Sequence, residues 1–321
     1  MFLSRIAKAA IAIMAIVTIG PLHTAYAQDY PVKPVRLLAS TAGGGTDFAA
    51  RVLAQGLAPG MAQAVFVENR AAFNSIEAAS KATPDGYTLL VMGIPVWLAP
   101  YLQDNVPWDP VRDFQPVTTL TRQVTILVVQ SSLPINSIKD LIDYAKAKPG
   151  QLNYGSGGTG TSSHLSGELF KSMAAADIVR INYKGAADAL TALLGGQIQV
   201  MFGNPASAAT HVKSGRVRAL AVSSAQPSSL YPGLPPVASV LPGYELVEIL
   251  GLLAPAKTPM AIVNRWNQSA GRLLNSPELK EKFLASGSEV ATGTPEAFAT
   301  AINSDMTKFG KVIKDARLQE K

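Results

Sequence analysis

The sequence predicts an α/β fold with mostly parallel sheets, arranged as two domains. Short runs of β-branched and aliphatic residues alternate with longer amphipathic runs, which is typical of βαβ units. The chain has 321 residues, enough for two domains with separate cores. A strand, a Gly/Thr-rich turn and a helix are predicted in residues 37–57, and the same pattern returns in residues 152–173. If two such domains face each other, both turns line one cleft, because ligands of open α/β sheets bind beyond the carboxyl ends of the strands.

The first 27 residues have the pattern of an export signal. Arg5 and Lys8 give a short basic start, residues 9–20 are apolar, and residues 25–27 (Ala-Tyr-Ala) match the small-x-small cleavage rule. The apolar run is shorter than a bilayer-spanning helix needs, although a retained membrane anchor is the alternative. We therefore expect cleavage after Ala27 and a periplasmic protein. The chain contains no Cys, so we expect neither a lipid anchor nor a disulfide.

The pattern along the chain places the main elements. We expect helices at residues 46–57 and 137–148, and strands at residues 35–40, 64–67, 87–92, 125–129, 178–183, 199–202, 220–222 and 250–254. Three further helices are predicted to begin where a capping hydroxyl precedes a proline at the first helical position, namely at Thr258-Pro259, Ser276-Pro277 and Thr294-Pro295.

The composition excludes several functional classes. The 28 Lys and Arg against 22 Asp and Glu give a mild positive charge that is scattered along the chain, so we expect no nucleic-acid partner. The three histidines show no metal-ligand spacing, and we expect no metal or cofactor. Residues 155–160 satisfy G-x-G-x-x-G, but the next predicted strand does not end in an acidic residue, which argues against a dinucleotide site. Ser162 and His164 have no evident acidic third member, so we expect a protein that is not an enzyme.

The two Gly/Thr-rich turns are the candidate binding elements. A helix N-terminus presents unpaired N–H groups and about half a positive charge, and glycine lets the backbone approach a ligand closely. Each turn could hold one carboxylate without a lysine. The alternative is that both are ordinary tight turns. The candidate residues are Gly43, Gly44, Gly45 and Thr46 in the first turn, and Ser156, Gly158, Thr159, Thr161 and Ser162 in the second.

Two polar residues next to these turns have open roles. Asp47 caps its own helix or orients the turn, or else it meets a ligand amino group, a ligand hydroxyl group or a bound water. His164 lies in the first turn of the second predicted helix, where it faces the cleft or serves a core or capping role.

The chain resembles the Bug family, the extracytoplasmic binding proteins of tripartite tricarboxylate transporters. The matching motifs run through nearly the whole chain after the predicted signal. They are residues 30–35 (Tyr-Pro-Val-Lys-Pro-Val), 42–47 (Ala-Gly-Gly-Gly-Thr-Asp), 67–70 (Val-Glu-Asn-Arg), 84–90 (Pro-Asp-Gly-Tyr-Thr-Leu-Leu), 108–110 with 113–114, 154–165, 183–185 (Tyr-Lys-Gly), 213–215 with 218–222, and 251–255 (Gly-Leu-Leu-Ala-Pro) with 258–259.

The resemblance implies a two-lobed Venus-flytrap fold, with lobe 1 at residues 28–128 and 249–321 and lobe 2 at residues 129–248. It implies that small carboxylates bind between the lobes through the two turns, with Lys184 and Asn204 in matching positions. It also implies delivery to two membrane permease subunits of an ion-coupled carrier. We expect the binding protein itself to be a monomer.

Departures from the family pattern point to the ligand. Residues 71–75 read Ala-Ala-Phe-Asn-Ser where the family usually has Pro-Gly-Ala-Gly-Gly, and Gly203 replaces a common Asp. Phe73 and Trp97 could pack against an aromatic carboxylate such as terephthalate, and Arg122 could contact it. The alternatives are that Phe73 and Trp97 are core or surface residues and that Arg122 is a structural charge. An aliphatic di- or tricarboxylate, or an amino acid, is the other ligand class.

A different function would leave the same sequence pattern. A periplasmic sensor subunit, whose closed form docks on a membrane kinase, has the same requirements as a transport protein and is the alternative function.

Overall fold

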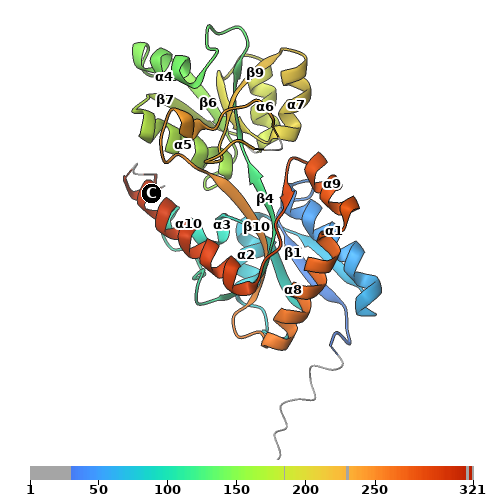
Figure 1. The fold of residues 1–321 in the computed structure, drawn as a ribbon. Coiled ribbons are helices and arrows are strands. Elements are labelled where there is room, and N and C mark those ends of the chain that lie inside the picture. The colour runs from blue at the N-terminus through green and yellow to red at the C-terminus, as the bar shows by residue number, and fades with distance from the viewer. Residues whose placement is uncertain (1–29, 184, 229–230, 316–317, 320–321) are drawn as a thin grey trace, which may run out of the picture.

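Two lobes joined by two chain crossings make up the molecule (Figure 1). The computed structural model describes residues 30–183, 185–228, 231–315 and 318–319. The predicted export signal lies outside the described residues. Each lobe has one sheet with helices on both faces, so the predicted α/β class is confirmed. Within the described residues, no helix combines the length and the apolar character that a bilayer crossing requires.

Lobe 1 is built on a six-stranded sheet with the order β11-β4-β10-β3-β1-β2. Its strands are β1 (Val35–Ala39), β2 (Val65–Asn69), β3 (Thr88–Met92), β4 (Phe114–Val124), β10 (Val247–Pro255) and β11 (Glu289–Val290). Alternate residues of a strand face opposite sides, so Leu37 packs with one set of helices and Leu38 with the other. One face is covered by α1 (Gly45–Met61), α8 (Met260–Leu274) and α9 (Pro277–Ala285), and the other by α2 (Ala72–Ser80), α3 (Pro95–Leu102) and α10 (Pro295–Asp315).

Lobe 2 has a five-stranded sheet with the order β7-β6-β8-β5-β9. Its strands are β5 (Ile126–Gln130), β6 (Leu152–Ser156), β7 (Ile178–Asn182), β8 (Val200–Gly203) and β9 (Val217–Val222). Its helices are α4 (Ile138–Ala147), α5 (Ser162–Ala174), α6 (Ala186–Leu194) and α7 (Pro205–Lys213). Phe170 and Phe202 belong to a hydrophobic core that continues through the crossings into lobe 1, so the lobes are packed together at the hinge.

Strand direction is mixed rather than mostly parallel. The βαβ units give parallel pairs, β1 with β2 and β3, and β6 with β7 and β8. The strands next to the crossings pair antiparallel, β10 with β3 and β4 in lobe 1, and β5 with β8 and β9 in lobe 2. The right-handed βαβ rule applies to strands that follow each other in one sheet. A strand that arrives from the other lobe is not subject to this rule and can pair antiparallel.

The chain changes sheets at Thr125 and again between β9 and β10. The backbone N–H of Thr125 donates to Ser223 Oγ at 2.8 Å, and the N–H of Ser223 donates to the Thr125 carbonyl at 2.9 Å, so the two crossings are tied together. The boundaries expected from the sequence lie after residues 128 and 248. The structure instead places residues 126–128 in the sheet of lobe 2, and it places Val247 in the sheet of lobe 1.

Two of the three predicted proline starts have the expected geometry. Ser276 caps α9 by accepting from Leu279 N, and Thr294 Oγ1 accepts from Ala297 N at 3.1 Å at the start of α10. At α8 the prediction is one residue early: Pro259 is the cap, and Thr258 Oγ1 instead donates to the Pro255 carbonyl at 2.7 Å. Because the Thr258 hydroxyl is used in this local bond, it does not cap the helix, which begins at Met260.

Candidate functional site

A cleft of about 970 Å³ lies between the lobes, and both Gly/Thr-rich turns line it. This volume is at the upper end of the range for small-molecule pockets. The crossing strands form its floor with Thr121, Gln123, Thr125, Glu248 and Leu250. Of the predicted residues, those that line the cleft are Gly43, Gly44, Gly45, Thr46, Phe73, Gly158, Thr159, Thr161, Ser162 and Asn204.

The first turn leaves the N-terminus of α1 open. Gly44 is the cap and provides no side chain to the amides, and Phe48 N donates the first helical bond to the Gly44 carbonyl at 3.0 Å. The N–H groups of Gly45 and Thr46 therefore precede the first helical donor and lie at the wall of the cleft. Gly43, at φ 84°, needs the freedom of glycine to make the turn.

Asp47 holds this turn from behind, which is the first of its two predicted roles. The carboxylate accepts from Gly43 N at 2.9 Å and from Asn69 Nδ2 at 2.9 Å, and it pairs with Arg51 Nε at 2.9 Å. Asp47 is 5% exposed and is not part of the cleft lining. Burial alone would raise the pKa of this carboxyl, but the hydrogen bonds from Gly43, Arg51 and Asn69 hold the pKa below its usual value.

Thr46 lines the cleft, but its hydroxyl group is hydrogen-bonded to Ser40. Thr46 Oγ1 accepts from Ser40 N at 3.2 Å and forms a short hydrogen bond with Ser40 Oγ. These contacts fasten the start of α1 to the end of β1, so the hydroxyl fixes the position of the amides.

The second turn is closed by its own side chains. Ser163 Oγ accepts from Gly157 N at 3.1 Å, and His164 Nδ1 accepts from Gly160 N at 3.1 Å. Thr161 caps α5 by accepting from His164 N. His164 thus holds the turn and is 3% exposed, and burial, followed by the charges of Arg180 and Lys171, lowers its pKa to about 3. The neutral imidazole is therefore an acceptor within the turn, and of its two predicted positions it takes the buried one.

Arg180 is a site residue that was not predicted from the sequence. From β7 it reaches under the second turn, where its Nε donates to Ser156 Oγ at 2.8 Å and its Nη2 to the Gly157 carbonyl at 3.2 Å. Both of its terminal nitrogens lie 3.4 Å from Thr159 Oγ1. Ser156 is fully buried by this arrangement and, contrary to the prediction, does not line the cleft. The guanidinium places a fixed positive charge behind the turn.

Glu248 is the second missed residue, and it carries the only charged side chain among the described residues that line the cleft. It stands on β10 opposite Gln123 of β4, and its Oε2 accepts from Ser162 Oγ at 2.7 Å. Burial raises the pKa of this carboxyl, and the hydrogen bond from Ser162 opposes the rise.

Trp97 does not line the inter-lobe cleft and takes its alternative position in the core. Trp97 lies in the first half of α3 and is fully buried. Its Nε1 donates to Asp305 Oδ2 at 3.1 Å, and its ring packs edge-on against Phe298 with centroids 6.1 Å apart. The apolar α3 turns Trp97 toward α10, which is why this side chain belongs to the core of lobe 1.

The remaining predicted residues divide between wall and surface. Phe73 is half-buried at the cleft wall and packs edge-on against Trp108 at 5.4 Å. Asn204 lines the cleft and caps α7 by accepting from Ser207 N at 3.1 Å. Arg122 is exposed on β4, opposite Ile249, and does not line the cleft, in agreement with its structural alternative. Lys184 lies outside the described residues.

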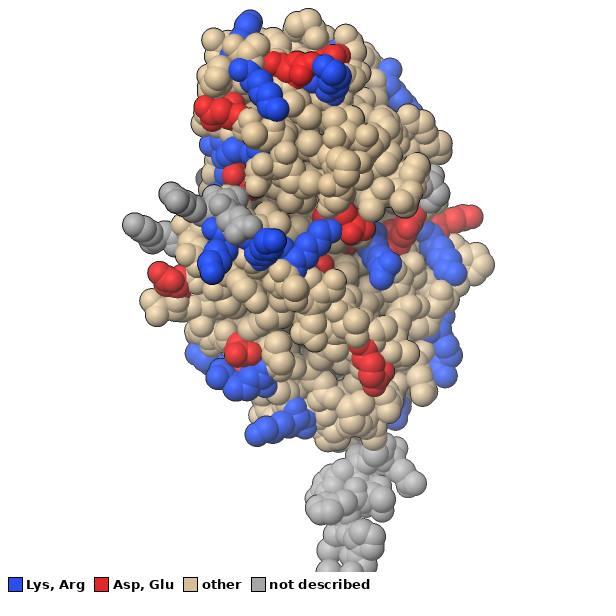
Figure 2. All heavy atoms as spheres, turned by 60° about the vertical axis from the view of Figure 1, so that its left-hand side comes forward, with Lys and Arg blue, Asp and Glu red and all other residues tan. Residues whose placement is uncertain are grey.

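Charges gather where the lobes meet, outside the cleft lining. Figure 2 shows Lys and Arg side chains in a band across the middle of one face, with Asp and Glu beside them. An ion pair between Lys308 Nζ and Glu245 Oε2 at 2.9 Å joins α10 to the segment that leads into β10. No Lys or Arg stands among the described residues that line the cleft, so backbone amides, hydroxyl groups and the side-chain amides of Asn and Gln are left there to contact an anion.

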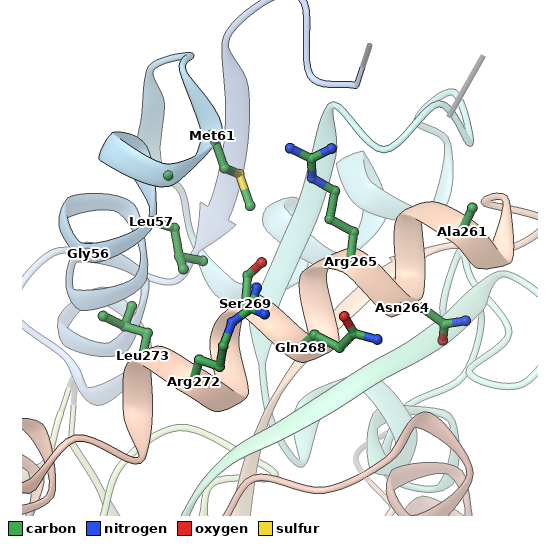
Figure 3. A pocket seen from close by; sticks show the side chains of 11 residues that line it. Gly56, Leu57, Met61, Ala261, Asn264, Arg265, Gln268, Ser269, Arg272 and Leu273 are labelled. Carbon is green, nitrogen blue, oxygen red and sulfur yellow. The ribbon is translucent and has the colours of Figure 1, made fainter. Parts of the chain in front are cut away.

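A second groove, of about 610 Å³, lies between α1 and α8 (Figure 3). Arg265 and Arg272 of α8 extend along it, and Leu57 and Met61 of α1 form the opposite wall. Both walls belong to lobe 1, so a movement of one lobe against the other does not close this groove around a ligand. The inter-lobe cleft is the candidate site for that reason.

Comparisons with known proteins agree with this geometry. Residues 49–318 match the family described as the tripartite tricarboxylate transporter family receptor, TctC. BugT from Bordetella pertussis is 30% identical over 94% of this chain and 94% of its own length. Rpa4515 of R. palustris with adipate has a TM-score of 0.81 at 31% identity and covers 89% of this chain and 98% of its own. MatC from Rhodopseudomonas palustris with bound malate has a TM-score of 0.77 at 26% identity, over 88% and 100%.

These matches confirm the resemblance to the Bug family and the prediction that the protein is not an enzyme, because the family and its structural neighbours are binding proteins of transporters. The family match covers most of the chain. The chain therefore belongs to the TctC family of tripartite tricarboxylate transporter receptors, which includes the Bug proteins.

Proposed function

We propose that this protein captures a small organic dicarboxylate in the inter-lobe cleft and presents it to the membrane subunits of a tripartite tricarboxylate transporter. The observation that supports this most is that two helix-opening turns from different lobes line one cleft. A dicarboxylate bridging the turns would contact both lobes and so stabilise the closed form. Adipate and malate in the two neighbouring structures are both dicarboxylates.

Hydrogen bonds alone can supply the affinity. A charge-assisted hydrogen bond contributes about 1.5–3 kcal/mol. Micromolar binding corresponds to about 8 kcal/mol. About six such bonds, shared between the turns, exceed this value and leave a surplus for the costs of lobe closure and desolvation.

Phe73 supports a ligand with an apolar middle. It is the one predicted aromatic contact that lines the cleft. We propose that the spacer between the two carboxylates packs on this ring, as an aromatic ring or an alkyl chain would. Terephthalate and adipate are the test compounds for the two spacers.

We propose that the protein works in the periplasm, which the export pattern of residues 1–27 and the match to the TctC receptor family support. We propose that it acts there as a monomer, because one chain supplies both walls of the cleft.

Isothermal titration calorimetry on residues 28–321 with terephthalate, adipate, malate, citrate and glutamate tests the function. We expect the tightest binding for a dicarboxylate with an apolar spacer. Phe73→Ala should weaken that ligand more than malate, whereas Trp97→Phe should lower the melting temperature without changing affinity. Tight binding of glutamate, with no binding of any dicarboxylate, would overturn the proposal.

A further inference from the structure

The cleft contains a carboxyl group at the place where an anion is expected to bind. Glu248 stands on β10, one of the two strands that cross at the hinge, and its side chain reaches the first turn of α5 in lobe 2. Ser162 Oγ donates to Oε2 at 2.7 Å. One carboxyl oxygen is thereby fixed to the second turn of the candidate site.

The other oxygen, Oε1, lies near Gly93. A Cβ atom at Gly93 would lie 3.9 Å from Glu248 Oε1 and only 2.6 Å from the Ile249 carbonyl oxygen. Gly93 therefore allows β3 to approach β10 and leaves room next to Oε1. Gly93 and Glu248 both line the cleft, and Oε1 has no hydrogen-bond partner among the described residues.

No described basic group neutralises this carboxyl. The neighbouring elements present Gln123 from β4 and Ser162 from α5, which are uncharged. Arg122 faces the other side of β4, opposite Ile249.

Titratable and basic side chains of α5, β7 and α10 have other partners. His164 of α5 accepts from Gly160, Arg180 of β7 bonds Ser156, and Lys308 of α10 pairs with Glu245. Lys171 of α5 pairs with Glu168. The burial of Glu248 raises its pKa, in agreement with a carboxyl that lacks a cationic partner.

An ionised Glu248 would repel a dicarboxylate held at the second turn. A protonated carboxyl instead offers an O–H group, and an O–H donor to a carboxylate forms a strong, short hydrogen bond. Proteins do keep carboxylic acids neutral in apolar sites so that they can donate in this way.

We propose that Glu248 meets the ligand as a neutral acid, donating a hydrogen bond from Oε1 to a carboxylate oxygen of the ligand, so that binding takes up one proton from solvent. The proton stays shared between the two carboxyl groups, and no covalent bond changes. This inference rests on the proposed function, because it requires an anionic ligand. It also explains how a cleft with an acidic side chain admits a dianion and disfavours a zwitterion.

Calorimetry of the tightest dicarboxylate from the panel tests the inference, with titrations between pH 5.5 and 8.5 in buffers of different ionisation enthalpy. We expect an uptake close to one proton per ligand at the upper end of this range. The affinity of the wild-type protein should then fall by about tenfold per pH unit, which is the slope for one linked proton.

Glu248→Gln is the decisive variant, because its amide donates a hydrogen bond at every pH. We expect it to lose both the proton uptake and the pH dependence, and so to bind more tightly than the wild type at pH 8.5. Ser162→Ala is the second variant. It removes the hydrogen bond to Glu248 that favours the ionised carboxylate, so the fall in ligand affinity should occur at higher pH.

Three results would count against the account in different ways. Binding without proton uptake in the wild type would overturn the inference alone. Loss of affinity in Glu248→Gln at every pH, with the circular dichroism spectrum unchanged, would show instead that an ionised Glu248 accepts from a ligand donor. No binding of any dicarboxylate at any pH would overturn the proposed function.

Discussion

The turn that opens α1 and the turn that opens α5 share one sequence pattern, a strand followed by a Gly/Thr-rich turn and a helix, yet they treat their backbone amides differently. In the first turn, Asp47 accepts from the amide of Gly43, and Gly44 at the N-cap offers no side chain to the amides of α1, which leaves the start of α1 open to the cleft. In the second turn, the side chains of Ser163 and His164 accept hydrogen bonds from the amides of Gly157 and Gly160, so these amides are not available to a ligand.

The difference shows that glycine spacing predicts the shape of such a turn, but the polar side chains within it decide which amides remain available. We infer that the first turn supplies most of the amide donors to a ligand. The second supplies hydroxyl groups on a rigid frame backed by Arg180. The predictions below separate these two roles, from the largest expected effect to the smallest.

Asp47 is the strongest single support of the first turn. Asp47→Asn should destabilise the protein by about 1–3 kcal/mol, because the amide group cannot accept the bonds of Gly43, Asn69 and Arg51 together. It should also weaken ligand binding. Urea denaturation with calorimetry measures both effects.

The pH dependence of this effect has a defined sign. The pKa of Asp47 is lower in the folded protein than its usual 3.8, so its stabilising contribution is complete above that value and is lost as the pH falls below it. Asp143→Asn is the matched control, since Asp143 also pairs with a basic residue four positions away but is exposed. A control that loses as much stability as Asp47→Asn would contradict the assigned role.

Arg180 should matter more for binding than for folding. Arg180→Met removes the bonds that fix Ser156 and the Gly157 carbonyl, and it removes a positive charge behind the second turn. We expect affinity to fall by about tenfold, which is about 1.4 kcal/mol. Calorimetry at two salt concentrations measures it, and an unchanged affinity would mean that the second turn does not hold the ligand.

The threonine hydroxyls should show the smallest effects, and the two turns should differ. Thr46 Oγ1 fastens α1 to β1, whereas Thr159 Oγ1 lies at a longer 3.4 Å from Arg180. Thr46→Ala should weaken binding by about 1 kcal/mol and Thr159→Ala by less. The reverse order would argue that the second turn contributes the larger share.

The fold and the position of the candidate site could be predicted from local sequence patterns. Two side chains of the site, Arg180 and Glu248, could not. Glycines before an amphipathic run predicted both turns, because helix starts leave local sequence signals. Arg180 and Glu248 reach the site through strand pairing, with Tyr154 opposite Arg180 and Gln123 opposite Glu248. Such register depends on tertiary packing, which one sequence does not reveal.

Arg180 and Glu248 are site residues that were not predicted. Trp97 is the reverse case, a residue considered as a ligand contact that lies in the core. An aromatic residue near a predicted cleft can face either way. The helix of residues 95–102 was not predicted because it contains two prolines, Pro95 at its first position and Pro100 inside it. Once the helix forms, its packing against α10 decides the direction of the indole ring.

One pair of variants tests most directly whether backbone amides of the first turn hold the ligand. Gly45→Pro removes a single N–H at the first helical position, where proline is tolerated and where Gly44 already has the extended backbone that precedes a proline. Gly45→Ala keeps the N–H, and a Cβ there meets no atom within 4 Å. Titration of both with the preferred dicarboxylate should show a loss of about tenfold or more for the proline variant and near wild-type affinity for the alanine variant. Equal affinities in the two variants would contradict the account.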